Sequence, residues 1–149
     1  MAVASRFTVA LHALAFLADR KANNDEYVTS DQIAFSVGTS PVFIRRILGS
    51  LRKANLVNVK HGGTDTGWKL SKNPDTITLL NVYNAIIQKP LFEQHHSTPS
   101  SQCVIGKGIQ PALKQMYDES ETAMKQQLDQ YSISNLLAET ITHYNLLES

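Results

Sequence analysis

The 149-residue sequence predicts a mainly α-helical fold in which a small β-hairpin interrupts a series of helices. Three observations support this fold class. Apolar residues recur at three- and four-residue intervals in six segments, which is typical of amphipathic helices. Residues 56–70 instead alternate like two short strands around a glycine-rich turn. A later helical pattern continues over about 24 residues, which is too long for so small a domain to cover.

The first helical segment runs from about Ser5 to Asp19, and a polar connector follows it. A second, short helix is capped by Thr29 or Ser30, because a side-chain hydroxyl at a helix start accepts a hydrogen bond from a free backbone amide. This helix ends at Gly38, since glycine readily adopts the left-handed conformation that terminates many helices.

Ser40 and Pro41 open a third helix, in which proline loses nothing because its amide would be unpaired there anyway. Four apolar residues form one buried stripe at helical spacing: Ile44, Ile47, Leu48 and Leu51. Residues 56–60 and 68–70 are the predicted strands, and residues 61–67 are the turn between them. Two helices joined by a tight turn and followed by a hairpin are the parts of a winged helix-turn-helix.

The second half of the chain is expected to contain three more helices. Thr78 caps a short helix that reaches Ile86, residues 89–104 are irregular, and a long helix runs from about Gly108 to Tyr131. A last helix begins after Ser132 or Ser134. We therefore predict a winged helix-turn-helix domain at 1–88, a sensor-like loop at 89–105, and a dimerisation helix with a C-terminal helix at 106–149.

The stretch Pro41–Ile86 resembles the signature of the Rrf2 family of bacterial transcription regulators. The resemblance is carried by these motifs: Leu51-Arg52-Lys53-Ala54, Leu56-Val57, His61-Gly62-Gly63, Asn73-Pro74, Ile77-Thr78-Leu79 and, later, Cys103-Val104-Ile105-Gly106. It implies a homodimer that binds an operator in double-stranded DNA, with the two long helices crossing and each winged domain entering a major groove. The alternative is a long helix packed wholly within one monomer.

The same resemblance implies the DNA-contacting residues. Ser40, Val42, Phe43 and Arg45 occupy positions from which the family reads bases and backbone, and Arg45 can pair bidentately with guanine. Arg46, Arg52, Lys53 and Lys60 are expected to contact phosphates or to remain solvated. His61 stands in the wing where the family commonly carries an arginine, and Trp68 is expected to pack the wing onto its domain.

The charge of the chain is unevenly distributed, although the net charge is only +1. Residues 1–75 contain ten Lys or Arg and six Asp or Glu, whereas residues 76–149 contain four and seven. This balance favours contact of the N-terminal half with a polyanion. A protein-binding surface would tend to replace the third helix's cations with apolar or aromatic residues. Here the cations remain, which favours DNA binding, and a winged-helix protein-interaction module without DNA binding is the alternative hypothesis.

Cys103 is the single cysteine, and it bears on both cofactors and signalling. Cluster-binding Rrf2 proteins resemble one another in carrying three loop cysteines, so we expect no iron–sulfur cluster, no other cofactor and no metal here. The alternative is a metal shared across a dimer by two Cys103 and histidines such as His12, His95 and His96. Cys103 is either a redox sensor, helped by a nearby helix start and Lys107, or a packing residue. A small effector between the winged domain and the long helix is a third possibility.

Other classes of protein find little support. The sequence has no glycine-rich phosphate loop, no His-Glu-x-x-His zinc motif and no Gly-x-Ser-x-Gly elbow, so an enzyme is not expected. The longest apolar run, Leu11–Ala18, is interrupted by His12 and is too short to span a membrane. The N-terminus lacks a signal-peptide pattern. We expect a cytoplasmic repressor that blocks polymerase when it is bound to its operator.

Overall fold

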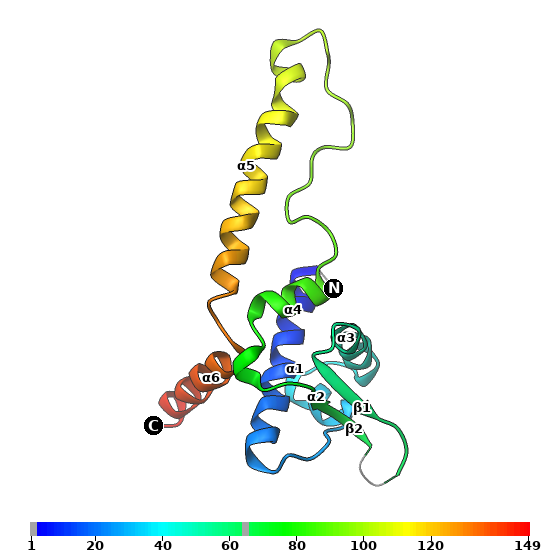
Figure 1. The fold of residues 1–149 in the computed structure, drawn as a ribbon, viewed down its shortest axis with the longest axis vertical. Helices are drawn as coiled ribbons and strands as arrows, with labels where there is room; N and C mark the ends of the chain where they lie inside the picture. The colour runs from blue at the N-terminus through cyan, green and yellow to red at the C-terminus, as the bar shows by residue number, and fades with distance from the viewer. Residues whose placement is uncertain (1–2, 64–65) are drawn as a thin grey trace.

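The computed structural model describes residues 3–63 and 66–149, so Thr64 and Asp65 of the predicted wing turn lie outside the described residues. In chain order the elements are α1 (Val3–Asn23), α2 (Ser30–Val37), α3 (Pro41–Lys53), β1 (Val57–Lys60), β2 (Gly67–Leu70), the 3₁₀ turn η1 (Pro74–Thr76), α4 (Leu79–Ile86), α5 (Val104–Leu128) and α6 (Ile133–Glu148). The predicted fold class is confirmed, and Figure 1 shows a body from which α5 extends as an arm.

The core of the body lies between α1, α3 and α4. All four residues of the predicted α3 stripe are completely buried, and they pack with side chains such as Leu14 of α1, Ile33 of α2 and Val82 of α4. Full burial of such a side chain contributes about 1.5–3 kcal/mol. Because the stripe occupies one side of α3, its opposite side must face solvent.

The helix starts follow the sequence signals and resolve two alternatives. Thr29, not Ser30, caps α2: its Oγ1 accepts from the amide of Gln32 at 3.1 Å, and the Gln32 Oε1 accepts the Thr29 amide at 2.9 Å. Ser132, not Ser134, caps α6 in the same reciprocal way. Gly38 ends α2 with a φ of +85°, as predicted.

The wing is an antiparallel hairpin whose register pairs Val57 with Leu70 and Lys60 with Gly67. Val28 adds a bridge on the other side of β2, exchanging backbone hydrogen bonds of 2.8 and 2.9 Å with Trp68. The Trp68 indole also donates to Ser30 Oγ at 3.2 Å and packs against the core, so the predicted anchoring role is confirmed. The wing therefore holds a defined position beside α3.

Two helices differ in length from the prediction. Helix α1 extends from Val3 to Asn23, because Arg20 and Lys21 suit a helix C-terminus and the side chain of Asn23 donates to the Asp19 carbonyl at 2.9 Å. Helix α5 begins about one turn early, at Val104, and ends at Leu128 rather than Tyr131.

The early start of α5 reflects packing that local propensity does not reveal. Gly106 lies against the loop, and a Cβ there would meet the Ser100 carbonyl oxygen at 2.5 Å. The glycine that weakens the helical pattern in sequence thus permits a close approach to the preceding loop.

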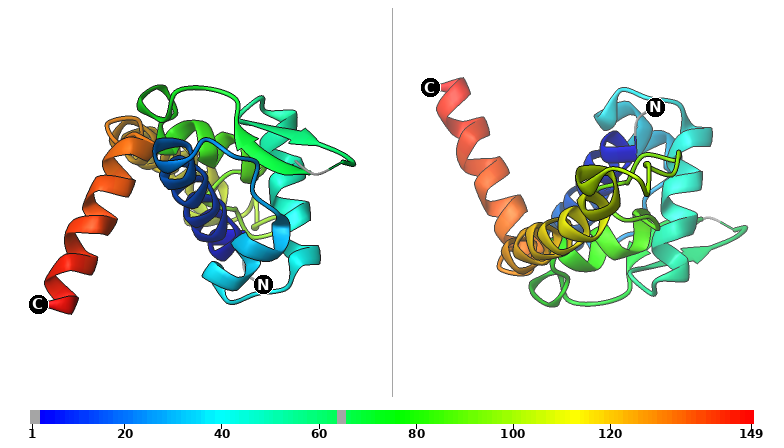
Figure 2. Two further views of the ribbon diagram at one scale, coloured as in Figure 1. Left: turned by 90° about the horizontal axis from the view of Figure 1, so that it is seen from below. Right: turned by 90° about the horizontal axis from the view of Figure 1, so that it is seen from above.

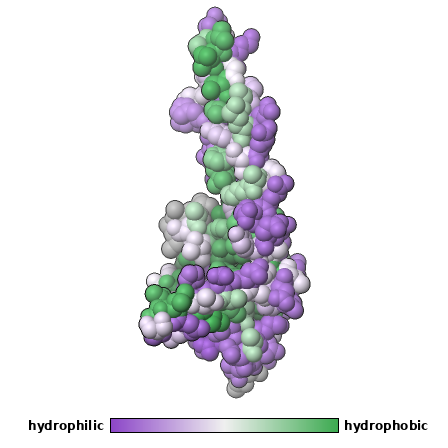
Figure 3. Space-filling model, turned by 90° about the vertical axis from the view of Figure 1, so that its left-hand side faces the viewer, coloured by the Kyte–Doolittle hydropathy of each residue, from purple (hydrophilic) through white to green (hydrophobic). Residues whose placement is uncertain are grey.

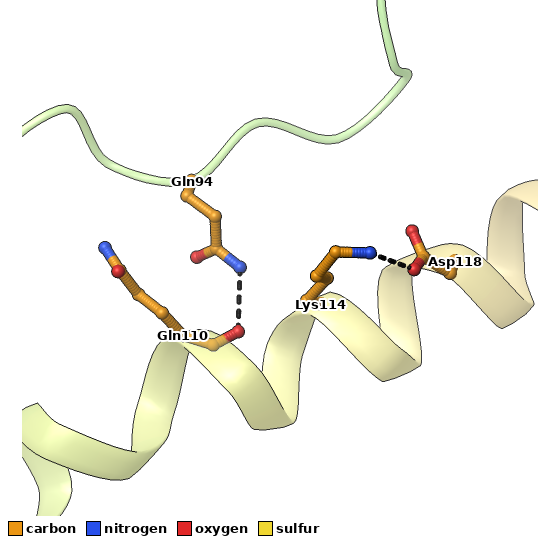
Figure 4. A network of polar contacts seen from close by, with 4 residues as sticks. All are labelled: Gln94, Gln110, Lys114 and Asp118. Atoms are coloured by element: carbon orange, nitrogen blue, oxygen red, sulfur yellow. Dashed lines mark hydrogen bonds and ion pairs between the residues drawn. The ribbon is translucent and has the colours of Figure 1, made fainter.

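The segment between α4 and α5 runs back along the arm. Gln94 donates to the Gln110 carbonyl at 3.1 Å, and in Figure 4 this bond lies beside the Lys114–Asp118 ion pair of α5. Phe92 also stacks on Tyr117 with ring centroids 4.7 Å apart. The predicted irregular loop therefore packs along α5.

Helix α6 leaves the body in a different direction (Figure 2). Its start is tied to the start of α4, since the Ile133 amide donates to the Ile77 carbonyl at 2.8 Å and the Leu79 amide donates to the Tyr131 carbonyl at 2.9 Å. Among the described helices, none is both long and apolar enough to cross a membrane.

Candidate nucleic-acid interface

The outward side of α3 combines cations with small or apolar side chains. Val42, Arg46 and Lys53 follow one another at positions i, i+4 and i+11, opposite the buried stripe, and all three are exposed. Val42 is 52% exposed despite its apolar side chain. A helix with this surface can enter a major groove, where apolar groups contact thymine methyls and cations reach phosphates.

Arg45 lies on the flank of α3 that faces the wing. It lines a hollow of about 290 Å³ together with Lys60 and His61 of the wing and the Trp68 side chain. Asp31 of α2 lines the same hollow. The structure thus brings Arg45 together with two predicted contact residues, Lys60 and His61, that lie 15 and 16 positions further along the sequence. Arg52, seven residues after Arg45, projects from the same flank.

The start of α3 supplies hydrogen-bond donors for a phosphate. Ser40 Oγ accepts the Phe43 amide at 3.2 Å, which leaves the hydroxyl proton available to an oxygen of the DNA backbone. Phe43 is half-buried and packs against the core, so it offers only part of its ring to a ligand.

The electrostatic surroundings of the α3 cations also bear on their role. Within residues 3–63 and 66–149, no carboxylate forms an ion pair with Arg45, Arg46, Arg52 or Lys53. Lys60 lies 5.8 Å from the ring centre of Tyr27, and Lys69 lies 4.8 Å from the same ring and 3.6 Å from Asp25. Sequence reasoning missed the contribution of Tyr27, because its partners come from the distant wing.

Helix α5 carries an uncovered apolar face. None of its 25 residues is buried, and its outward residues recur at helical spacing: Ile105, Ile109, Ala112, Met116 and Ala123. Ile105 and Met116 are 69% and 61% exposed. Figure 3 shows hydrophobic side chains along this side of the arm. Such a stripe on a long helix is typical of a helix–helix interface.

Comparison with known proteins assigns the family. A profile of the Rrf2 family, described as iron-dependent transcriptional regulators, matches residues 3–139. The chain belongs to the Rrf2 family. YwnA of Bacillus subtilis (strain 168), described as a candidate HTH-type transcriptional regulator, is 34% identical over 133 residues, which cover 89% of this chain and 95% of YwnA.

Solved structures agree with the Rrf2 assignment. A crystal structure described as a candidate DNA-binding protein is 32% identical and superposes with a TM-score of 0.70, covering 89% of this chain and 98% of the other. A candidate transcriptional regulator from Lactobacillus plantarum shares the fold with a TM-score of 0.77 at 23% identity, over 96% and 94% of the two chains. This Rrf2 protein is thus a DNA-binding transcriptional regulator and not an enzyme.

The residues of this Rrf2 protein do not fit the metal centre that the family description implies. An iron–sulfur cluster is usually held by four cysteine thiolates, and this chain has one, Cys103. Across the described parts of the chain, no three His, Cys, Asp or Glu side chains are grouped as metal ligands. The rings of His95 and His96 stack on each other at 4.5 Å. The thiol of Cys103 is exposed and makes no capping hydrogen bond to α5.

Proposed function

We propose that this Rrf2 protein binds a pseudo-palindromic operator as a homodimer and represses transcription by excluding polymerase. Helix α3 enters the major groove, and the wing follows the neighbouring backbone. The observation that carries the proposal is the outward surface of α3, which combines a Ser40-capped start with four exposed cations along the helix, none of them ion-paired within the described residues. Arg45 of α3 and His61 of the wing line the hollow between these two elements.

The two-fold arrangement rests on α5. A helix of 25 residues is about 37 Å long at about 1.5 Å per residue, and the described parts of the chain leave its apolar stripe exposed. Pairing with a second copy of α5 would remove that stripe from water. Two winged domains joined in this way are expected to contact half-sites about one helical turn apart or slightly more.

Binding measured against salt concentration tests the function. The protein is titrated into its own upstream region and into a scrambled duplex by fluorescence anisotropy. About six phosphate contacts per dimer, at about −0.9 each, predict a slope near −5 in log K against log salt. Sequence-specific binding with a shallower slope would mean that fewer of these cations contact phosphates. Absence of any sequence preference at every salt concentration would instead favour the protein-interaction module.

Two signals remain for regulation, oxidation of Cys103 and a small effector, and one variant separates them. Hydrogen peroxide would convert the exposed Cys103 thiol to a sulfenic acid, with water as the other product. If peroxide releases the wild-type protein from its operator but leaves Cys103→Ser bound, the thiol is the sensor. If both respond equally, or neither responds, the thiol is not the sensor.

A further inference from the structure

A cavity of about 620 Å³ lies where the arm meets the winged domain. Its walls come from the first turns of α1, the end of α4, the following segment and the C-terminal half of α5. Apolar side chains predominate, including Phe7, Ile86, Leu91, Met124 and Leu128. Cavities of about 300–1,000 Å³ with apolar walls and a few polar groups are typical of small-molecule sites. Hydrophobic surface also marks this junction in Figure 3.

Tyr83 of α4 places an unsatisfied polar group at the cavity wall. The residue is 6% exposed, and its ring packs edge-on against Phe7 with centroids 5.4 Å apart. Its hydroxyl has no hydrogen-bond partner within the described chain. Burial, and then the negative charge of Glu121, raise the pKa of Tyr83, so the hydroxyl stays protonated and can donate. Buried donors rarely remain without an acceptor.

The charged groups around the cavity favour an anion. Arg6 and Lys89 both line it, and neither forms an ion pair with a carboxylate in residues 3–63 and 66–149. Glu93 is the single acidic residue among the lining side chains. The nearby Glu121 already accepts the Leu91 amide at 2.8 Å. Lys125 Nζ lies 5.9 Å from the centre of the Tyr83 ring. With Glu121 and Lys125 included, three cations and two acids surround the apolar cavity, so the balance is positive by one charge.

We propose that this cavity binds a small organic acid whose apolar body lies against Phe7, Ile86 and Met124 and whose carboxylate is held by Arg6 and Lys89. The cavity is lined by the winged domain on one side and by α5 on the other, so its occupancy fixes the angle between them. The consequence for operator affinity rests on the proposed function, whereas the binding site itself does not.

Calorimetry with matched probes tests the site on the full-length protein. 1-Naphthaleneacetate and 1-naphthaleneacetamide share an apolar body and differ in charge, and decanoate with decanamide forms a second pair. We expect each carboxylate to bind at least about tenfold more tightly than its amide, one extra charge-assisted contact being sufficient for that factor. Arg6→Gln combined with Lys89→Gln should remove this difference. Lys107→Gln, which removes a cation from α5 outside the cavity, should preserve it.

A cavity-filling variant locates the binding. Met124→Trp should abolish binding of both members of each pair while the circular dichroism spectrum remains that of the wild type. Equal affinity for acid and amide, or binding that survives Met124→Trp, would overturn the proposal. So would failure of both carboxylates to bind. If, in addition, Met124→Trp turns a dimer into a monomer in sedimentation, the occupant of the cavity is a second copy of the chain.

Operator binding in the presence of 1-naphthaleneacetate separates the site from the function. A change in operator affinity that the Arg6→Gln/Lys89→Gln protein lacks supports both the site and its regulatory role. Carboxylate binding without operator recognition would support the binding site and contradict the proposed function. Operator recognition without carboxylate binding would support the proposed function and contradict the binding site.

Discussion

Individual side chains on α3 differ in what they can contribute to DNA recognition. Arg45 lines the hollow beside the wing, whereas Lys53 projects from the last turn of the helix into solvent. A guanidinium close to a groove can read a base edge, but a terminal ammonium at a helix end contacts the backbone. We therefore expect Arg45 to contribute to sequence specificity and Lys53 to contribute to affinity for DNA of any sequence.

Replacing Arg45 tests base readout. Arg45→Ala should lower discrimination against one wrong base pair by about 1–3 kcal/mol, because a bidentate contact is lost. Lys53→Ala, the matched control, should weaken all sequences alike and reduce the salt slope by about 1. Anisotropy titrations with the operator and its single-base variants measure both effects. Loss of discrimination in Lys53→Ala rather than Arg45→Ala would reverse the two assignments.

His12 makes stability sensitive to mild acid. Its Nε2 lies 2.9 Å from Ser36 Oγ, joining α1 to α2, and partial burial lowers the pKa of His12 below its ordinary value of 6.5. Because the folded-state pKa is the lower one, protonation favours the unfolded chain. The contribution of His12 is complete above pH 6.5 and is lost as the pH falls through the unfolded-state and then the folded-state pKa.

His12→Gln should therefore lose less unfolding free energy than the wild type between about pH 7.5 and pH 5. Urea unfolding at several pH values measures this difference. His96→Gln, a change at an exposed loop histidine, is the control and should follow the wild type. Parallel pH curves for wild type and His12→Gln would contradict the interpretation.

At the scale of elements, one glycine lets the wing pack against the segment before α2. Gly67 has a φ of +145°, and a Cβ there would lie 2.5 Å from the Val28 carbonyl oxygen. Val28 is the residue whose bridge to Trp68 joins the hairpin to the segment before α2. A side chain at position 67 must displace that segment and the neighbouring Trp68 anchor.

Gly67→Ala should thus destabilise the fold by about 1–3 kcal/mol, the usual range for backbone strain of this kind. Gly49→Ala is the contrasting variant, because Gly49 lies inside α3 with open space around its Cα. It should stabilise by about 0.5–1 kcal/mol, since alanine loses less backbone entropy in a helix. Chemical denaturation without DNA compares the two, and equal effects would contradict the account.

On the scale of the whole molecule, the exposed apolar face of α5 bears on the oligomeric state. Helix α5 contributes no buried residue, yet apolar residues recur along one face of it from Ile105 to Ala123, interrupted at Glu119 and Ser120. An isolated exposed stripe of this length would be unfavourable in water, and pairing relieves that cost. The oligomeric state and operator affinity should therefore change together.

Met116→Glu places a charge in the middle of the stripe and should raise the dissociation constant of the proposed dimer by at least about tenfold, because a buried unpaired charge costs well over 1.4 kcal/mol. Operator binding should weaken in parallel. Gln115→Glu introduces the same charge about a quarter-turn away from the stripe and should leave the dimer intact. Sedimentation equilibrium measures both, and an unchanged Met116→Glu assembly would exclude this face.

The sequence by itself determined the helix-turn-helix and the wing. Ser40-Pro41, Gly38 and the α3 stripe are signals between residues at most four positions apart, and they act through backbone hydrogen bonds and one-sided burial. Such local interactions leave the backbone few alternative conformations, so the helices predicted from the sequence pattern agree with the structure. The exposed cations of α3 could also be anticipated, because burying the stripe turns the opposite side outward.

Only the tertiary structure decided the junction between arm and body. Arg6, Tyr83 and Met124 meet there from three helices, and Gly106 lengthens α5 by accommodating the Ser100 carbonyl. These contacts join residues whose spacing follows no helical or strand period, and each depends on where whole elements pack. Local propensity carries no information about such distances, which is why the cavity and the true start of the long helix emerged only from the fold.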